Sequence, residues 1–225
     1  MREKIRKIIK LLHKRYGAPR PYRKSDPVDE LIRTILSQNT TDKNSLSAFW
    51  VLKKNFKSWD RILKLDIRRV ARLIRHAGLA NIKARRIKDA LKEINRREGK
   101  IGLSSLGRLD LESSLEYLRS LKGVGPKTAA CVLLFSFAKP IMPVDTHIFR
   151  VTKRLGLIDK KLNIQDAHTY LSGIVPKDLI YDFHLGIIEH GRKTCKAQYP
   201  RCGICVLYGV CKFEKKAFFR KRGLN

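Results

Sequence analysis

The stretch LKGVGPKTA, residues 121–129, joins two predicted helices, 111–121 and 126–137, by a turn with glycine at alternate positions. Glycine adopts backbone angles that other residues rarely adopt, and it lets a large ligand approach the main chain. Pro126 begins the second helix, so its first N–H groups and the positive end of its dipole face outward beside the turn. The turn therefore predicts a phosphate-binding site, with an ordinary turn closed by a glycine C-cap as the alternative.

Lys127 lies at the second position of this helix. A positive charge is unfavourable beside the positive end of the helix dipole, so we expect its amine to be neutral more often than usual. A neutral amine is a nucleophile, which makes Lys127 a candidate catalytic residue. A lysine that only contacts phosphate is the alternative. The candidate phosphate-binding residues of the turn are Gly123, Val124, Gly125 and Thr128.

Outward from this stretch, apolar residues recur at spacings of three and four, the period of an amphipathic helix. Convincing alternation of the strand type is not found, so the sequence predicts an all-α protein. Asp26 and Pro27 form the expected start of one helix. The segment 42–56 is predicted to be another, with Leu46, Phe49 and Trp50 as its large apolar residues. Further helices are expected at 3–16, 59–65, 67–76, 82–97, 145–155, 164–173 and 179–191.

Asp145 lies at a predicted helix start, inside the otherwise apolar stretch MPVDTHIFRV, residues 142–151. Aspartate is among the best N-cap residues, so a purely structural role is the strong alternative. A carboxylate held ionised by backbone N–H groups can also face a positive charge that develops on a sugar, as in glycoside cleavage. We therefore treat Asp145 as the second catalytic candidate. His147 is a candidate phosphate contact or, equally, a structural histidine.

Four of the five cysteines fall within seventeen residues: Cys195, Cys202, Cys205 and Cys211. A disulfide scaffold distributes its cysteines through the chain, whereas a compact cluster in a reducing compartment indicates a metal site. Four thiolates suit zinc or an iron–sulfur cluster, and ligand softness does not choose between them. The interval between the first two cysteines carries Lys196 and Arg201, which are candidate contacts to DNA phosphates.

The 225 residues include 50 Lys and Arg against 20 Asp and Glu, a formal net charge of +30. A folded chain with this charge repels itself, which favours a polyanionic partner, and nucleic acid is the usual one. Solubility or adaptation to heat is the alternative. The longest uninterrupted apolar run is the segment 129–135, far shorter than the roughly 20 residues of a membrane span. We therefore expect no membrane and a cytoplasmic location, at the chromosome if the partner is DNA.

These features, in this order, resemble the endonuclease III family of helix-hairpin-helix DNA glycosylases. The matching stretches are LKGVGPKTA at 121–129, VDTH at 144–147, HGRKTC at 190–195 and PRCGIC at 200–205 followed by Cys211, with looser matches of ILSQNTTD at 35–42 and GLANIK at 78–83. The resemblance covers nearly the whole chain. It implies a two-domain α-helical fold with DNA in the cleft, base flipping into a pocket, and a [4Fe-4S] cluster held by the four cysteines.

The implied domains are a central, six-helix barrel-like domain over residues 22–137 and an iron–sulfur domain built from residues 1–21 and 138–225. The first contains the helix-hairpin-helix, and the second takes its helices from both ends of the chain. The implied partner is double-stranded DNA with a damaged base or an abasic site, and the protein is expected to be a monomer.

The resemblance also implies roles for single residues. Lys127 falls on the family's catalytic lysine, which attacks C1′ of the damaged nucleotide to give a Schiff base and then strand scission by β-elimination. Asp145 falls on the catalytic aspartate, which stabilises the sugar cation and assists proton transfer. Leu79 lies where the family inserts a wedge into the base stack. Asn39, with Gln38 beside it, lies where endonuclease III has a glutamine that fills the vacated space.

The segment Gln38-Asn39-Thr40 departs from the family's pattern of a glutamine between two small residues. Because this loop contacts the extruded base and the orphaned partner, the substrate is the least secure part of the comparison. Oxidised pyrimidines are the first expectation, and alkylated purines or mismatched uracil or thymine are the alternatives. The expected activity is that of a bifunctional glycosylase and AP lyase. The competing hypotheses are a monofunctional glycosylase, in which Lys127 only contacts DNA, and a non-catalytic binder of damaged DNA.

Overall fold

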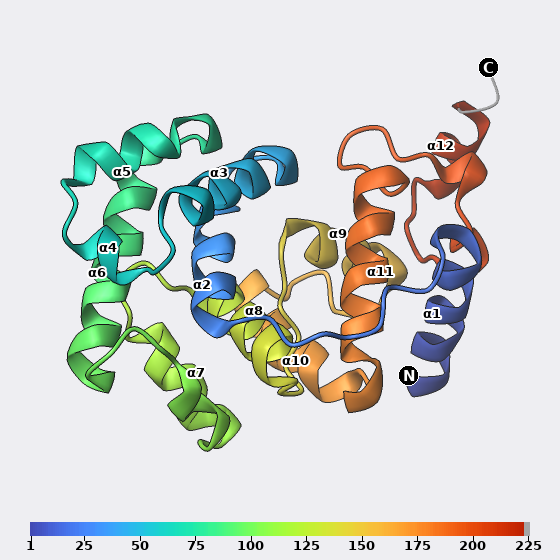
Figure 1. Ribbon diagram of the computed structural model, residues 1–225. Coiled ribbons are helices and arrows are strands. Elements are labelled where there is room, and N and C mark those ends of the chain that lie inside the picture. Colours follow the sequence, from blue (N-terminus) through green and yellow to red (C-terminus); the bar gives the residue numbers. More distant parts are fainter. Residues whose placement is uncertain (223–225) are drawn as a thin grey trace. The chain divides into compact units, whose positions relative to one another are not determined.

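The computed structural model describes residues 1–222, and every regular element within that range is a helix (Figure 1). This confirms the predicted all-α fold. The chain divides into two compact units, one formed by residues 23–139 and the other by residues 1–22 together with the chain from residue 140 onward. None of the helices in the described chain combines the length and hydrophobicity that a membrane crossing needs.

The unit of residues 23–139 is built around α8 (Pro126–Phe137), which is apolar on all sides and has eight of its twelve residues buried. It packs against α2 (Pro27–Leu36) and α7 (Leu111–Arg119). The side chain of Asp26 caps α2, because its Oδ1 accepts hydrogen bonds of 2.9 Å from the backbone N–H groups of Val28 and Asp29. The other helices are α3 (Asp42–Asn55), α4 (Asp60–Leu63), α5 (Ile67–Leu73) and α6 (Ala80–Glu98), with 3-10 turns at Arg75–Ala77 and Ser104–Gly107.

The second unit brings the N-terminal helix against a helix from late in the chain. α1 (Arg2–Tyr16) packs on α11 (Ile180–Lys193), which in turn packs on α9 (Thr146–Leu155). Gly186 permits the close approach of α1, since a Cβ there would lie 3.1 Å from Cδ1 of Leu12. The unit also contains α10 (Ile164–Ile174) and α12 (Lys216–Arg222), with 3-10 turns at Lys177–Leu179, Cys202–Ile204 and Tyr208–Val210.

Tyr16, at the end of α1, connects this helix to the start of the cysteine-rich segment. Its hydroxyl oxygen lies 2.7 Å from Oγ1 of Thr194 and 3.0 Å from Nδ1 of His190. Burial lowers the pKa of His190 to about 4, so the imidazole is neutral at pH 7. The contacts of Tyr16 therefore join the end of α1 to the end of α11, and the histidine in this contact is buried without a charge.

Candidate functional site

The hairpin before α8 has the geometry that its glycines predict. Gly123 has a positive φ of 85°, and a Cβ at this position would lie 2.6 Å from Cγ of Arg86. The next residue, Val124, is 6% exposed and anchors the turn in the core. Gly125 takes the N-cap position and offers no side chain to the helix end, so α8 starts without a side-chain cap. Its first turn thus presents backbone N–H groups and the positive dipole end at the surface of the unit.

Lys127 lies at the second position of α8 and is half-buried, and Thr128 beside it is 3% exposed. The sequence predicted this placement on α8 beside the hairpin. Arg86, from α6, was not singled out from the sequence. Its Nη1 donates a short hydrogen bond to Oε1 of Gln38 while its side chain packs over Gly123. Arg86 therefore links the hairpin to the loop after α2.

The candidate base-contacting residues lie on two strained loops. Asn39 has a φ of 50° and Leu79 a φ of 49°, and among residues 1–222 Ala138 is the only other non-glycine residue with positive φ. Asparagine tolerates the left-handed region, but for leucine it costs about 1–2 kcal/mol. Leu79 is nevertheless 49% exposed. Because this apolar side chain is exposed, burial does not offset the backbone strain. The strained conformation therefore points to a role outside the core.

Lys83, in the first turns of α6, ties these two loops together. Its side chain is 1% exposed, and its Nζ donates hydrogen bonds of 2.8 Å to the carbonyl of Leu36 and 2.7 Å to that of Ala77. The first carbonyl lies two residues before Gln38, and the second lies two residues before Leu79. Burial lowers the pKa of Lys83, and the neighbouring charge of Arg86 adds to this effect.

Asp145 caps α9 in the other unit. Its Oδ1 accepts a hydrogen bond of 2.8 Å from the backbone N–H of Ile148, and its own carbonyl accepts the N–H of Phe149. Within the described residues Oδ2 has no hydrogen-bond partner of its own, and the residue is partly exposed. The capping role considered from the sequence is therefore present. It occupies one carboxylate oxygen and leaves the second available to a ligand.

His147 packs at the junction of α9 and α11. A Cβ at Gly191 would lie 2.9 Å from Cβ of His147, and Nη2 of Arg150 lies 3.1 Å from its Nδ1. Arg150 also donates to the carbonyls of Gly191, at 2.9 Å, and Cys195, at 3.0 Å. Arg150, which the sequence did not mark, thus fixes both His147 and the first cysteine relative to α9.

The four cysteines of the C-terminal cluster line one small cavity, whose other walls are largely apolar. Among residues 1–222 no group of three or more His, Cys, Asp or Glu side chains is arranged to hold a metal ion. A single zinc ion needs four ligands that converge on one point at about 2.3 Å. The thiolates of an iron–sulfur cluster surround a larger body instead. Four thiols around one cavity are a donor set of the kind that both sites use.

Burial and hydrogen-bond donors act in opposite directions on the thiols, since burial favours the protonated form and the donors favour the thiolate. Burial raises the pKa of Cys202, of Cys211 and of Cys205, the last to about 12, so these thiols stay protonated until a metal displaces the proton. Nη1 of Arg154 donates to Sγ of Cys195 at 3.3 Å, and the N–H of Phe213 donates to Sγ of Cys211 at 3.5 Å. Such donors stabilise sulfur that carries negative charge.

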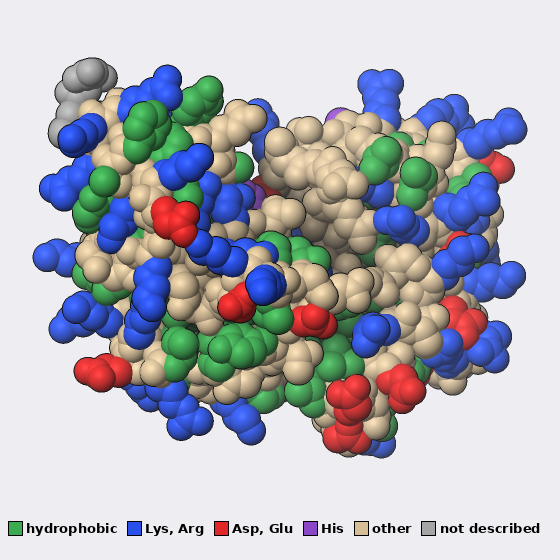
Figure 2. Space-filling view, turned by 180° about the vertical axis from the view of Figure 1, so that it is seen from behind, with side chains coloured by type: hydrophobic (Ala, Val, Ile, Leu, Met, Phe, Trp, Pro, Cys, Tyr) green, Lys and Arg blue, Asp and Glu red, His purple; other side chains and the backbone are tan. Residues whose placement is uncertain are grey.

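Lys196 and Arg201 lie on the loop between the first two cysteines and line a separate, larger cavity. Both are exposed, as expected of phosphate contacts. Figure 2 shows one face of the molecule, on which Lys and Arg side chains outnumber those of Asp and Glu. This distribution agrees with the net charge of +30.

The described chain matches one family model over most of its length. The model for the HhH-GPD superfamily of base excision DNA repair proteins matches residues 32–177, a range that contains both Lys127 and Asp145. Endonuclease III of Sulfolobus acidocaldarius is 38% identical over 185 residues, which are 81% of this chain and 80% of that protein. A relative from Arabidopsis thaliana is 37% identical over 171 residues, 75% of this chain, and the chain spans only 58% of its length.

The fold also matches that of a protein whose structure was solved in complex with DNA. The solved structure of a trapped endonuclease III–DNA covalent intermediate, an estranged-adenine complex, matches with a TM-score of 0.82 and 27% identity. The match covers 97% of this chain and 99% of the other.

Proposed function

Because the chain belongs to the HhH-GPD superfamily of base excision DNA repair proteins and is a DNA glycosylase with AP lyase activity, we propose that Lys127 is its nucleophile. The observation that carries this assignment is the position of Lys127. The residue lies half-buried at the second position of a helix that starts without a side-chain cap, beside a glycine hairpin. We infer that a phosphate bound at the hairpin brings the adjoining sugar to this amine.

The proposed reaction begins with attack of Nζ of Lys127 on C1′ of the damaged nucleotide. The new C–N bond forms as the glycosidic bond breaks and the base leaves. Ring opening and loss of the amine proton give an imine between Lys127 and C1′. Removal of a proton from C2′ then expels the 3′ phosphate oxygen, which cleaves the strand by β-elimination. Each step needs only the amine, an acceptor for protons and water to release the product.

We assign Asp145 to the stabilisation of the positive charge that develops on the sugar as the base leaves. One carboxylate oxygen, Oδ1, is held by the N–H of Ile148, which fixes the orientation of the group. The other oxygen is available to face the sugar. A carboxylate oriented in this way is the electrostatic arrangement that glycoside cleavage uses.

DNA binding is assigned to two sets of residues. Gly123, Val124, Gly125 and Thr128 bind phosphate through their backbone, and His147, Lys196 and Arg201 add contacts from the other unit. Gln38, Asn39 and Leu79 contact the base pair that is opened. We infer that the protein acts as a monomer on damaged or abasic double-stranded DNA at the chromosome, with oxidised pyrimidines as the first substrate class.

We propose that the four cysteines hold a [4Fe-4S] cluster. The cluster supplies a structural link between α11 and the C-terminal segment and takes no part in the reaction assigned to Lys127. Two observations support this proposal. The four thiols line one cavity, and hydrogen-bond donors lie beside the sulfur atoms of Cys195 and Cys211.

A lesion panel tests the substrate class. Duplexes with one oxidised pyrimidine, one alkylated purine or one mismatched uracil or thymine are scored separately for released base and for strand scission. We expect release from the oxidised pyrimidine together with scission. Base release from the purine or mismatch duplexes alone would contradict the assigned class, and release without scission on any lesion would contradict the role of Lys127.

Asp145→Asn tests the role of the second carboxylate. Asparagine caps helices about as well as aspartate, so the melting temperature is expected to stay unchanged. Base release is expected to slow by about 10²-fold, because the charge that faces the sugar is lost. Asp110→Asn is the matched control, since Asp110 caps α7 through a bond of 2.8 Å to the N–H of Ser113. Equal rates of base release for the two variants would show that Asp145 only caps α9.

Iron content tests the cluster. The purified protein is expected to be brown and to contain about four iron atoms per chain, because each thiolate binds one iron of a [4Fe-4S] cluster. Cys205→Ala is expected to lose the colour, whereas Cys131→Ala, which alters a cysteine buried in α8, keeps it. A colourless protein with one zinc ion per chain would refute the proposal.

A further inference from the structure

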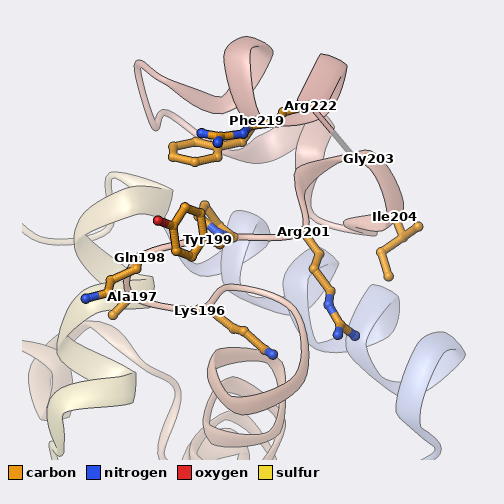
Figure 3. A pocket seen from close by; sticks show the side chains of 10 residues that line it. Lys196, Ala197, Gln198, Tyr199, Arg201, Gly203, Ile204, Phe219 and Arg222 are labelled. Atoms are coloured by element: carbon orange, nitrogen blue, oxygen red, sulfur yellow. The ribbon is translucent and has the colours of Figure 1, made fainter. Parts of the chain in front are cut away.

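The loop between the first two cysteines, the 3-10 turn at Cys202–Ile204 and α12 line a cavity of about 810 Å³ that is open to solvent. Figure 3 shows Phe219 of α12 and Tyr199 of the loop on opposite sides of the space, with Arg222 beside Phe219. Tyr199 is 65% exposed, which is unusual for so large a ring. The described lining also includes Lys196 and Arg201 and no acidic residue.

Both walls of this cavity are held in place by contacts within the unit. Arg154 donates to the carbonyl of Lys196 at 2.7 Å and to that of Ala197 at 2.9 Å, which fixes the loop wall. Lys216 donates to the carbonyls of Tyr208, at 3.1 Å, and Cys211, at 2.6 Å, which fixes the start of α12. The cavity is therefore formed before any ligand enters it.

Phe219 is itself supported from behind. Its ring stacks on that of Phe213, with centroids 6.2 Å apart and an interplanar angle of 14°. Arg222 of the same helix reaches across the space, and its guanidinium carbon lies 5.7 Å from the centroid of the Tyr199 ring on the other wall. Two rings and a guanidinium plane thus line a space whose remaining charged residues are all cations.

We propose that this cavity binds an unpaired base of a single-stranded DNA segment. The proposal rests on the proposed function only in taking DNA as the partner. Flat rings and guanidinium planes bind the faces of bases, and cations around them bind the phosphates of the same strand. A base inside a duplex is covered on both faces by its neighbours, so the rings favour a strand whose bases are exposed. The volume lies within the range of about 300–1,000 Å³ typical of ligand sites.

Binding of the full-length protein to a fluorescein-labelled oligothymidine tests the proposal, with a blunt undamaged duplex of the same length as the reference. Tyr199→Ala and Phe219→Leu are expected to weaken oligothymidine binding about tenfold, the usual loss when one stacking ring is removed. Leucine at 219 retains packing against Phe213. Duplex binding stays unchanged in both variants. Tyr170→Leu is the control, because Tyr170 is 45% exposed in the same unit and lies outside the cavity lining.

A cross-link locates the base directly. An oligonucleotide with 5-iodouracil is expected to form its photo-cross-link in a peptide that contains Tyr199 or Phe219. A cross-link elsewhere, or equal loss of oligothymidine and duplex binding in the two variants, would overturn the proposal. So would polyglutamate that competes as well as oligothymidine, since charge alone would then explain binding. AP lyase activity is measured in parallel, so failure of the proposed function is seen separately.

Discussion

Lys127→Ala abolishes the covalent complex that the wild-type protein is expected to form with abasic-site DNA in the presence of borohydride. Borohydride reduces an imine to a stable amine, and an imine forms only where a primary amine reaches C1′. Strand scission is expected to fall by about a thousandfold or more, because the variant keeps DNA binding but loses the attacking group. The trapped species is measured by gel electrophoresis, and DNA binding by anisotropy.

Lys122→Ala is the matched control, since Lys122 is exposed and lies on the same hairpin, five residues before Lys127. It is expected to keep the trapped complex while binding DNA somewhat more weakly. An undiminished adduct in Lys127→Ala would show that another amine attacks C1′. Base release by the wild-type protein with no trapped complex would favour the monofunctional hypothesis, in which Lys127 only contacts DNA.

The helices on both sides of the hairpin were predictable because local signals agree with tertiary packing there. The predicted helix 126–137 is α8 (Pro126–Phe137), where proline at the first position and an unbroken apolar run leave little freedom. Asp145 was likewise expected at a helix start, with N-capping as the alternative to a catalytic role, and α9 begins at the next residue, Thr146. Local chemistry at these helix ends is strong enough to set them without knowledge of the rest of the chain.

The buried face of α3 was less predictable. Leu46 and Trp50, the large apolar residues expected there beside Phe49, are 41% and 64% exposed. The helix instead buries Ser45, Ala48, Phe49 and Leu52. Side-chain size does not decide which face a helix buries, because small residues allow the close approach of a neighbouring helix.

α12 (Lys216–Arg222) was not predicted at all. The segment has seven residues, is mostly cationic, and carries no apolar stripe long enough to show a helical period. Its position depends on hydrogen bonds from Lys216 to carbonyls of the cysteine-rich segment, which no local pattern reveals. The cavity that it forms with the 196–201 loop was for the same reason invisible in the sequence.

Lys83, which joins the two candidate base-contacting loops, was also missed, because one lysine among 50 basic residues carries no signal. Lys83 differs from the others in burial, with 1% of its side chain exposed and, within the described chain, two carbonyls rather than a carboxylate as partners. A buried cation without an anion is costly, so its retention needs a compensating role. Fixing the loops that carry Gln38 and Leu79 is such a role.

Lys83→Met is therefore expected to affect both stability and base release. Methionine fills similar space but leaves the carbonyls of Leu36 and Ala77 without partners, at about 1–3 kcal/mol each. Removal of the buried charge offsets part of this, so we expect the free energy of unfolding to fall by about 2–4 kcal/mol. Base release from damaged duplex is expected to slow by about tenfold or more, since a small misplacement of positioning groups is costly. Borohydride trapping on a preformed abasic site, which needs no base extrusion, should change less.

Lys88→Met is the matched control on the same helix. Lys88 donates a short hydrogen bond to the carbonyl of Leu65, away from both loops. Lys88→Met is expected to lower the free energy of unfolding less than Lys83→Met does. It should leave the ratio of base release to borohydride trapping unchanged. A fall in base release and trapping by the same factor in Lys83→Met would show loss of fold and not loss of loop positioning.

The pH dependence of unfolding gives a second test of the buried lysine. Burial lowers the folded-state pKa of Lys83 below its ordinary value of 10.5. Between these two values the unfolded chain binds more protons than the folded chain, so the contribution of Lys83 to the free energy of unfolding rises with pH. Urea titrations give the free energy of unfolding of the wild type and of Lys83→Met at each pH. The wild-type value minus the variant value should rise with pH below 10.5. A difference that is flat with pH would mean that the amine is solvated in the folded state. The two carbonyl bonds would then not be what holds the loops.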